Sequence, residues 1–326
     1  MNVAVLAGGS FAIPLLDAIA DSEHRLAGVV SRPDRPHGRG RIATPSPAAL
    51  WAMAGEWPLL RPIRVSVPSF EPEFRALGAD VAVVADFGEI LKPFVFAWTR
   101  HGFFGLHPSL LPRWRGAAPI PWTILSGDGM TGVSVFKISA SVDTGHVALS
   151  ETIPVCDRET GATLAHRLAK TGAVVMLEAL RHLQTGSLTL TPQPPGDAPV
   201  ARKLRRLDGM LRWETDAFAL DRVVRALVPW PCAWCQCHGR EVKVLRSFPL
   251  SAKSEYSPGT VVGATVVEGE GEGVRIACGS GELVLLELQS PGKLPLPALV
   301  WLRGARLAVG DVLPGAGFGE SKGESP

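Results

Sequence analysis

Residues 3–20 read VAVLAGGSFAIPLLDAIA, a short apolar run joined through Gly8 and Gly9 to a segment of helical composition. Similar apolar runs follow at 26–30 (LAGVV) and 80–85 (DVAVVA). Short apolar runs that alternate with helical segments are typical of parallel strands buried on both faces of a sheet. The first part of the chain is therefore predicted to be α/β, with ligands bound beyond the carboxyl ends of its strands.

The Gly8–Gly9 turn does not predict a dinucleotide site. The sequence has no G-x-G-x-x-G pattern there and no convincing acidic residue closing a second strand, and the dinucleotide fingerprint requires both. We interpret the two glycines as a tight turn.

The composition describes a globular protein long enough for two domains: of 326 residues, 46% are apolar and 20% are charged. The balance of 33 basic and 31 acidic residues, a net charge of +2, is too small to indicate nucleic acid by itself. Five cysteines, an odd number, argue against a disulfide scaffold and fit a reducing compartment. The N-terminus lacks signal-peptide features and is too short to span a bilayer, so we expect a cytoplasmic protein without a membrane partner.

Composition also predicts the domain organisation: a first domain at 1–190, a linker at 191–206, a second domain at 207–313 and a disordered tail at 314–326. A long helix at about 160–182 closes the first domain, and the proline-rich, then basic, stretch after it is typical of a linker. In the second domain a helix (DAFALDRVVRAL) precedes strand-like segments separated by glycines (EVKVLRS, GTVVGATVV, GVRIACG, LVLLELQS). This pattern predicts a small, OB-like β-barrel.

The stretch GLHPSLLPRWRGAAPI, residues 105–120, is predicted to be a shaped loop, because its proline spacing suits neither a helix nor a strand interior. It follows strand-like FFGL, which places it at the ligand-binding edge. His107 is the candidate acid or base there. Asp143, which follows the β-like segment GVSVFKI, is the candidate partner that orients His107 or stabilises its charge. The alternative for His107 is a purely structural role.

Arginines mark two further candidate sites. Arg113 and Arg115 flank Trp114 as a fork for phosphate or carboxylate, or as simply solvated side chains. The insert RPDRPHGRGR, residues 32–41, holds four arginines, and its glycines and prolines predict a basic finger without regular structure. Contact with a phosphate backbone and a merely soluble loop are both open for this finger.

Cys232, Cys235 and Cys237 (CAWCQC) imitate a metal site. Only the adjacent His238 accompanies them at short spacing, so we expect a β-hairpin with incidental thiols and no metal.

The motifs resemble those of the methionyl-tRNA formyltransferase family, from residue 3 to about 313. The family core reads approximately N-x-H-x-S-L-L-P-x-W-R-G-A-A-P-I, and residues 105–120 follow it at every position but the first. Further similarity is carried by RPDRPHGRG with TPSP behind it, VVADFGEIL, TGVSVFKISASVDTG, LRW and VRALVPWPCAW. The core motif and VDTG are also similar to nucleotide-sugar N-formyltransferases, which lack the arginine-bearing insert.

The resemblance implies a Rossmann-like formyltransferase domain followed by a tRNA-binding β-barrel. It further implies formyl transfer from 10-formyltetrahydrofolate to initiator methionyl-tRNA, by a protein we expect to be a monomer. The residues implied as catalytic are His107, Asp143 and Gly105, the last at the position of the family's asparagine. The residues implied in folate binding are Ser109, Leu110, Leu111, Pro112, Phe87, Gly88 and Ile90. The residues implied in tRNA binding are Arg35, Arg39, Arg41 and Lys203.

Gly105 is the main departure from the family pattern, because glycine supplies no side-chain donor to the oxyanion of the transfer reaction. Loss of one such donor costs on the order of 10²- to 10³-fold in rate. Two alternatives are open: the donor is simply lost, or a water in the space left at residue 105 or the backbone N–H of Gly105 takes its place. In the first case Gly105→Asn raises the rate, which is the outcome we expect, and in the second it gains little. Three hypotheses follow: a working formyltransferase, a tRNA- or folate-binding protein without turnover, and a formyltransferase acting on another amine, such as a nucleotide amino sugar.

Overall fold

The computed structural model describes residues 1–37 and 42–314. The chain forms two compact units. Unit 1 comprises Met1–Pro119, Met130–Pro154 and Leu164–Arg202, and unit 2 comprises Ile120–Gly129, Val155–Thr163 and the chain from Lys203 onward. The predicted tail, apart from Pro314, lies outside the described residues.

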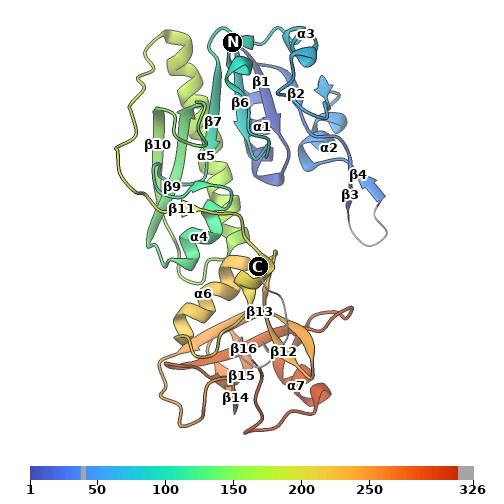
Figure 1. Ribbon diagram of the computed structural model, residues 1–326, viewed down its shortest axis with the longest axis vertical. Coiled ribbons are helices and arrows are strands. Elements are labelled where there is room, and N and C mark those ends of the chain that lie inside the picture. Colours follow the sequence, from blue (N-terminus) through green and yellow to red (C-terminus); the bar gives the residue numbers. More distant parts are fainter. Residues whose placement is uncertain (38–41, 315–326) are drawn as a thin grey trace, which may run out of the picture. The chain divides into compact units, whose positions relative to one another are not determined.

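Unit 1 is built on a seven-stranded sheet in the order β10-β9-β7-β6-β1-β2-β5 (Figure 1). Its strands are β1 (Asn2–Ala7), β2 (Arg25–Val30), β5 (Leu59–Leu60), β6 (Val81–Ala85), β7 (Phe103–His107), β9 (Met130–Lys137) and β10 (Val147–Pro154). The five strands from β5 to β7 run parallel, whereas β9 and β10 are antiparallel additions at one edge. The parallel sheet predicted from the apolar runs is confirmed.

The α-helices of the first 185 residues are α1 (Ile13–Ala20), α2 (Pro47–Ala54), α3 (Glu71–Arg75), α4 (Pro119–Leu125) and α5 (Gly161–Thr185). Short 3-10 helices occur at η1 (Ser10–Ala12), η2 (Pro68–Phe70) and η3 (Pro93–Trp98). The predicted long helix at 160–182 is confirmed as α5, and it extends three residues further than expected.

Both faces of the sheet are covered, as β7 illustrates. Phe103 on one face stacks on Phe74 of α3, with ring centroids 5.8 Å apart. Leu106 points to the other face, where α5 approaches so closely that a Cβ at Gly172 would lie 2.8 Å from the Leu106 side chain. Because successive strand residues alternate between faces, Gly105 and His107 share the face of Phe103.

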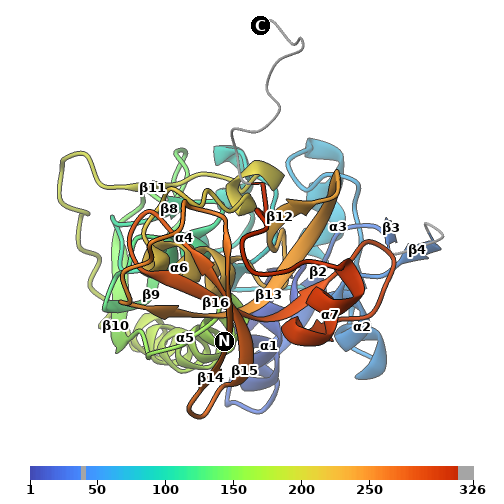
Figure 2. The ribbon, with the colours of Figure 1, turned by 90° about the horizontal axis from the view of Figure 1, so that it is seen from below.

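Unit 2 has an antiparallel sheet in the order β12-β13-β16-β15-β14, and β17 pairs with β16. Its strands are β12 (Ala233–Cys237), β13 (Arg240–Leu250), β14 (Val261–Val267), β15 (Gly271–Ala277), β16 (Glu282–Gln289) and β17 (Leu296–Pro297). They confirm the four predicted strand segments. In the described part of the chain from Lys203 onward, the helical segments are η4 (Arg206–Gly209), α6 (Ala217–Leu227) and α7 (Ala298–Ala305). The helix predicted in the second domain is confirmed as α6. The further helix α7 packs on β15 and β16 (Figure 2).

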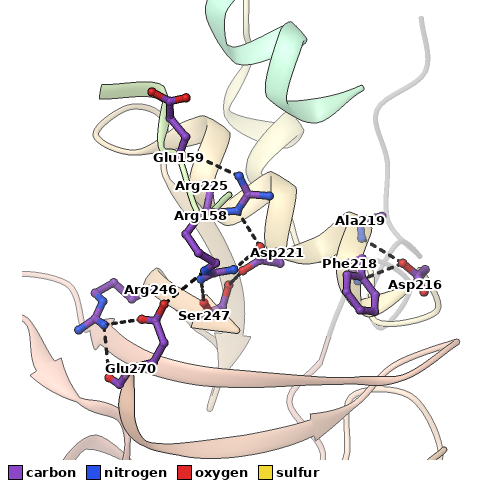
Figure 3. Close-up of polar contacts among 10 residues, drawn as sticks. All are labelled: Arg158, Glu159, Asp216, Phe218, Ala219, Asp221, Arg225, Arg246, Ser247 and Glu270. Carbon is purple, nitrogen blue, oxygen red and sulfur yellow. Dashed lines mark hydrogen bonds and ion pairs between the residues drawn. The ribbon is translucent and has the colours of Figure 1, made fainter. Parts of the chain in front are cut away.

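A buried charge cluster ties α6 to the rest of unit 2 (Figure 3). Asp221, 2% exposed, pairs with Arg158 and Arg225 at 2.7 Å each. Its Oδ1 accepts a hydrogen bond from Ser247 Oγ on β13 at 2.8 Å. The first turn of α6 is capped by Asp216, whose carboxylate accepts from two backbone N–H groups at 3.0 and 3.1 Å (Figure 3).

The basic insert corrects one prediction. Regular structure was not expected there, yet β3 (Arg35–His37) and β4 (Ile42–Thr44) pair as antiparallel strands. Proline at residue 36 is compatible with this pairing because a two-stranded ribbon has only edge strands. Residues 38–41, and therefore Arg39 and Arg41, lie outside the described residues. None of the helices in the described part of the chain combines the length and apolar character needed to cross a membrane.

Candidate active site

Strand β7 ends at His107, at the carboxyl edge of the parallel strands. The His107 side chain is 7% exposed, and its Nε2 lies 2.8 Å from the backbone oxygen of Trp114. Because a carbonyl oxygen only accepts, Nε2 carries a hydrogen in this contact. Nδ1 faces Asp143 Oδ2 at 3.6 Å, too long for a hydrogen bond but within close electrostatic range. The structure thus brings the two predicted catalytic side chains together.

Asp143 lies in the turn between β9 and β10, and its φ of 53° falls in the left-handed region. Aspartate is one of the few non-glycine residues that adopt this conformation readily. Besides facing His107, Oδ2 accepts a hydrogen bond from the backbone N–H of Gly116 at 2.9 Å. The carboxylate is therefore fixed between an imidazole and the loop that follows β7.

That loop, residues 108–118, is held in shape by its own polar groups. Ser109 Oγ donates to the Arg113 carbonyl at 2.6 Å. Ser134 on β9 donates to the Ser109 carbonyl at 2.8 Å and accepts from the Leu111 N–H at 3.1 Å. Sequence reasoning missed Ser134, because a serine inside a strand carries no signal of loop contact.

The Arg113–Trp114–Arg115 fork is engaged within the protein. The Arg113 guanidinium lies 4.6 Å from the centre of the Trp114 ring, which is the distance of a cation–π contact. Arg115 donates to the side-chain oxygen of Gln193, from Nε at 2.9 Å and from Nη2 at 2.5 Å.

The stretch that composition predicts to be a linker contacts the same loop. Its strand β11 (Val200–Ala201) pairs in parallel with β8 (Arg115–Gly116). The Pro199 carbonyl accepts from the Trp114 N–H at 2.8 Å. Gln193, in the same stretch, was also missed from sequence, since a single glutamine among prolines and polar residues does not differ from linker composition.

Gly105 lies directly beside an aromatic ring. It pairs with Phe136 of β9, and a Cβ built on Gly105 would overlap that ring, with Phe136 Cζ at 2.6 Å. Phe136 is only 5% exposed, and its ring fills the space that the Cβ of any larger residue at position 105 would need. Next to Cα of residue 105, the Phe136 ring therefore occupies the space that a side chain would enter.

A pocket of about 480 Å³ opens at the ends of β1, β2 and β6. From β1 the chain continues to β2 on one side, whereas from β6 it continues to β7 on the other side, so the strand order reverses between β1 and β6. Open α/β sheets bind ligands at such a switch point. The residues lining it are Gly8, Gly9, Arg32, Pro33, Arg35, Thr44, Pro45, Ser46, Pro47, Leu50, Asp86 and Phe87. The Asp86 residue is exposed overall, but its carboxylate lies against the Gly9 backbone. Desolvation of the carboxylate there raises the pKa of Asp86, and the Arg32 guanidinium offsets only part of this shift.

The predicted folate residues fall into two groups. Ser109 is 1% exposed and Leu110, Leu111 and Pro112 are half-buried in the loop beside His107. At the end of β6, Phe87 is 3% exposed and reaches the pocket, whereas Ile90 is 72% exposed. Gly88, between them, has a left-handed φ of 71°. Of the predicted tRNA residues, Arg35 lines the pocket and Lys203 is exposed at the start of the third segment of unit 2.

The cysteine motif forms the hairpin expected from the sequence, with β12 and β13 antiparallel. Cys235 and Cys237 pack in the core of unit 2. Across residues 1–37 and 42–314, no group of three or more His, Cys, Asp or Glu side chains is arranged to hold a metal ion.

Both units of the chain are similar to known proteins. The formyl transferase family model matches residues 1–180, and the model of the formyl transferase C-terminal domain matches residues 203–306. The methionyl-tRNA formyltransferase of Salinispora arenicola is 38% identical over 96% of this chain and 100% of its own length. The chain belongs to the methionyl-tRNA formyltransferase family. The member from a Roseiflexus species is 35% identical over 100% of this chain and 99% of its own.

Solved structures show the same fold at lower identity. HypX from Aquifex aeolicus, solved in complex with tetrahydrofolic acid, superposes with a TM-score of 0.64 at 19% identity, over 94% of this chain and 48% of HypX. An N-formyltransferase from Helicobacter canadensis, solved with folinic acid and dTDP-3-aminofucose, has a TM-score of 0.63 at 13% identity, over 88% of this chain and 98% of its own. This member of the methionyl-tRNA formyltransferase family is thus a formyl-group transferase whose fold other N-formyltransferases share.

Proposed function

We propose that the protein transfers the formyl group of 10-formyltetrahydrofolate to the α-amino group of initiator methionyl-tRNA. The observation that carries the proposal is the His107–Asp143 pair, 3.6 Å apart at the ligand-binding edge of a formyltransferase fold. With this substrate the protein would act in translation initiation, and we propose a cytoplasmic monomer.

The reaction is an acyl transfer. The neutral amine attacks the formyl carbon, a new C–N bond forms, and the formyl oxygen becomes an oxyanion. Collapse of this intermediate breaks the bond to N10, while the amine loses a proton and N10 gains one. We propose that the Nε2–H of His107, which donates to the Trp114 carbonyl in this structure, donates to the oxyanion when substrates are bound. Asp143, on the Nδ1 side of the ring, supplies the compensating negative charge.

The folate part of the proposal is supported by the surface near His107. Folate presents flat aromatic rings, which bind to apolar side chains flanked by polar backbone groups. Leu110, Leu111 and Pro112 are half-buried and Ile90 is 72% exposed, so apolar surface is available in both predicted folate segments. The folate-contacting residues proposed are these four with Ser109, Phe87 and Gly88.

The tRNA part rests on basic residues in both units. Arg35, Arg39, Arg41 and Lys203 are proposed to contact phosphates, and Arg35 stands beside the 480 Å³ pocket at the switch point. The alanine variant of Arg39 and Arg41 should bind tRNA more weakly, with a salt slope smaller by ~1 for each lost contact. Its affinity for tetrahydrofolate should be unchanged.

A formylation assay with purified protein, 10-formyltetrahydrofolate and charged initiator tRNA tests the function. We expect measurable turnover, and loss of most of it in His107→Ala and Asp143→Ala with the fold retained by circular dichroism. Phe136 over Gly105 is the observation that favours the alternative, a binding protein without turnover. Wild-type protein that binds both ligands and yields no product would establish that alternative. Product formed only with a nucleotide amino sugar would favour a formyltransferase that acts on another amine.

A further inference from the structure

Both polar atoms of the Gln193 side chain form hydrogen bonds, one with the turn that carries Asp143 and the other with Arg115 in the loop after β7. Its Nε2 donates to the backbone carbonyls of Asp143 and Gly145, at 2.8 Å each. Its Oε1 accepts from Nε and Nη2 of Arg115, at 2.9 and 2.5 Å. The amide therefore uses both its hydrogens and its oxygen on the two segments that surround the Asp143 carboxylate.

These contacts also fix the orientation of the amide. The two carbonyls require the NH₂ end and the guanidinium requires the oxygen, so the reversed amide would lose all four hydrogen bonds. The chain around Gln193 is anchored as well, because Thr191 and Val147 exchange backbone hydrogen bonds of 2.8 Å in both directions. The Gln193 side chain is therefore held in one orientation, in which it bridges the two segments.

The contacts meet at the carboxylate that faces His107. Asp143 has a left-handed φ of 53°, and its Oδ2 takes the Gly116 N–H, one residue after Arg115. Gln193 holds the Asp143 backbone on one side and Arg115 on the other, and so it sets where Oδ2 lies relative to His107 Nδ1. A shift of about 1 Å in such a contact costs up to ~10²-fold in rate.

We propose that Gln193 is a positioning residue of the formyl-transfer site, which acts by holding the Asp143 carboxylate against His107. The proposal rests on the proposed function, because it assigns no chemistry to Gln193 itself. It also gives the stretch whose composition predicts a linker a role in the site of unit 1.

The test is Gln193→Glu, which keeps the shape and an acceptor for Arg115 but turns a carboxylate oxygen toward two carbonyls. We expect kcat to fall about 10- to 100-fold, with KM for both substrates and the melting temperature little changed. Gln193→Met, which removes the hydrogen bonds without adding charge, should also lower kcat. Gln184→Glu is the matched control, since Gln184 is exposed on α5 in the same unit, and it should retain the wild-type rate.

A double-mutant cycle separates positioning from general structural support. If Gln193 acts through Asp143, then Gln193→Glu should cost little further rate in an Asp143→Asn background. Equal fold losses in both backgrounds would overturn the inference, as would a wild-type kcat in both Gln193 variants of an active enzyme. Absence of formylation in the wild-type protein itself would instead overturn the proposed function, and this inference with it.

Discussion

Gly105 and Phe136 face each other on paired strands, and together they determine what a restored asparagine would do. Gly105→Asn alone places a Cβ into the Phe136 ring. Overpacking of this kind costs about 1–3 kcal/mol of stability, and we expect the melting temperature to fall with no gain in kcat. This outcome replaces the simple expectation that an added amide speeds the reaction.

The double variant Gly105→Asn with Phe136→Ala should show the benefit of the amide. Relative to Phe136→Ala alone, we expect the single-turnover rate to rise by up to ~10²- to 10³-fold, the worth of one oxyanion donor. The comparison cancels the cavity that both variants share. An increase in rate from Gly105→Asn alone, without loss of stability, would show that the Phe136 ring moves aside freely.

Asp86 predicts a pH dependence of stability. Burial raises its pKa in the folded protein, so folding penalises the charged carboxylate. The contribution of the protonated Asp86 carboxyl to the free energy of unfolding is complete below its pKa in the unfolded chain, about 4. This contribution is lost as the pH rises through the pKa of Asp86 in the folded protein. Asp86→Asn should therefore raise the melting temperature at pH 7 and leave it unchanged near pH 3.5.

Exposed Asp197 in the same unit offers the matched control, Asp197→Asn, whose effect should be small at both pH values. An Asp86→Asn difference that is the same at both pH values would show that shape, and not charge, governs this position.

Among secondary-structure elements, α6 depends on its buried charge cluster (Figure 3). Asp221→Ala would leave Arg158 and Arg225 without their shared carboxylate, at exposures of 33% and 17%. Removing one partner of a buried ion pair costs on the order of 3 kcal/mol, which urea-induced unfolding measures. Arg246→Ala, on a side chain 53% exposed, should cost less than about 1 kcal/mol, and equal losses would contradict this account.

Elements with a strong local pattern could be predicted from sequence. The apolar runs of β1, β2 and β6 and the long periodic segment of α5 allow few alternatives, and each was found. Short elements that form only by pairing with another segment could not be predicted, as β11 and β3 illustrate. The strand β11 is only two residues long and is stabilised by the loop it pairs with, and β3 exists through pairing with β4 despite its proline. The strand β11 depends on β8 and the strand β3 depends on β4. The composition of either segment alone does not encode its pairing.

The residues of the candidate site also fall into those that the sequence predicts and those that it does not. His107 and Asp143 follow recognisable segments, and the order of strands brings them together. Phe136, Ser134 and Gln193 became visible only through register and long-range contact. An antiparallel register between β7 and β9 decides which side chain faces Gly105, and a one-residue slip would have placed another there.

For the molecule as a whole, the five cysteines report on the integrity of unit 2, where all of them lie. Cys156 is exposed, whereas Cys232, Cys235, Cys237 and Cys278 are buried. Burial raises the pKa of Cys235 and of Cys278 to about 12, and the thiolate is the form that reacts. The native protein should therefore react rapidly with a thiol reagent at one site only.

The same reagent then measures unfolding of unit 2. In urea we expect the remaining four thiols to become reactive in one transition, because Cys235, Cys237 and Cys278 belong to a single hydrophobic core with Leu285 and Trp213. Cys156→Ser should abolish the rapid reaction and leave that transition in place. Rapid labelling of two or more thiols in the native Cys156→Ser protein would show that the β12–β13 hairpin opens well before the rest of the sheet. Asp221→Ala should shift the transition to lower urea, since the cluster that it breaks holds α6 on this core.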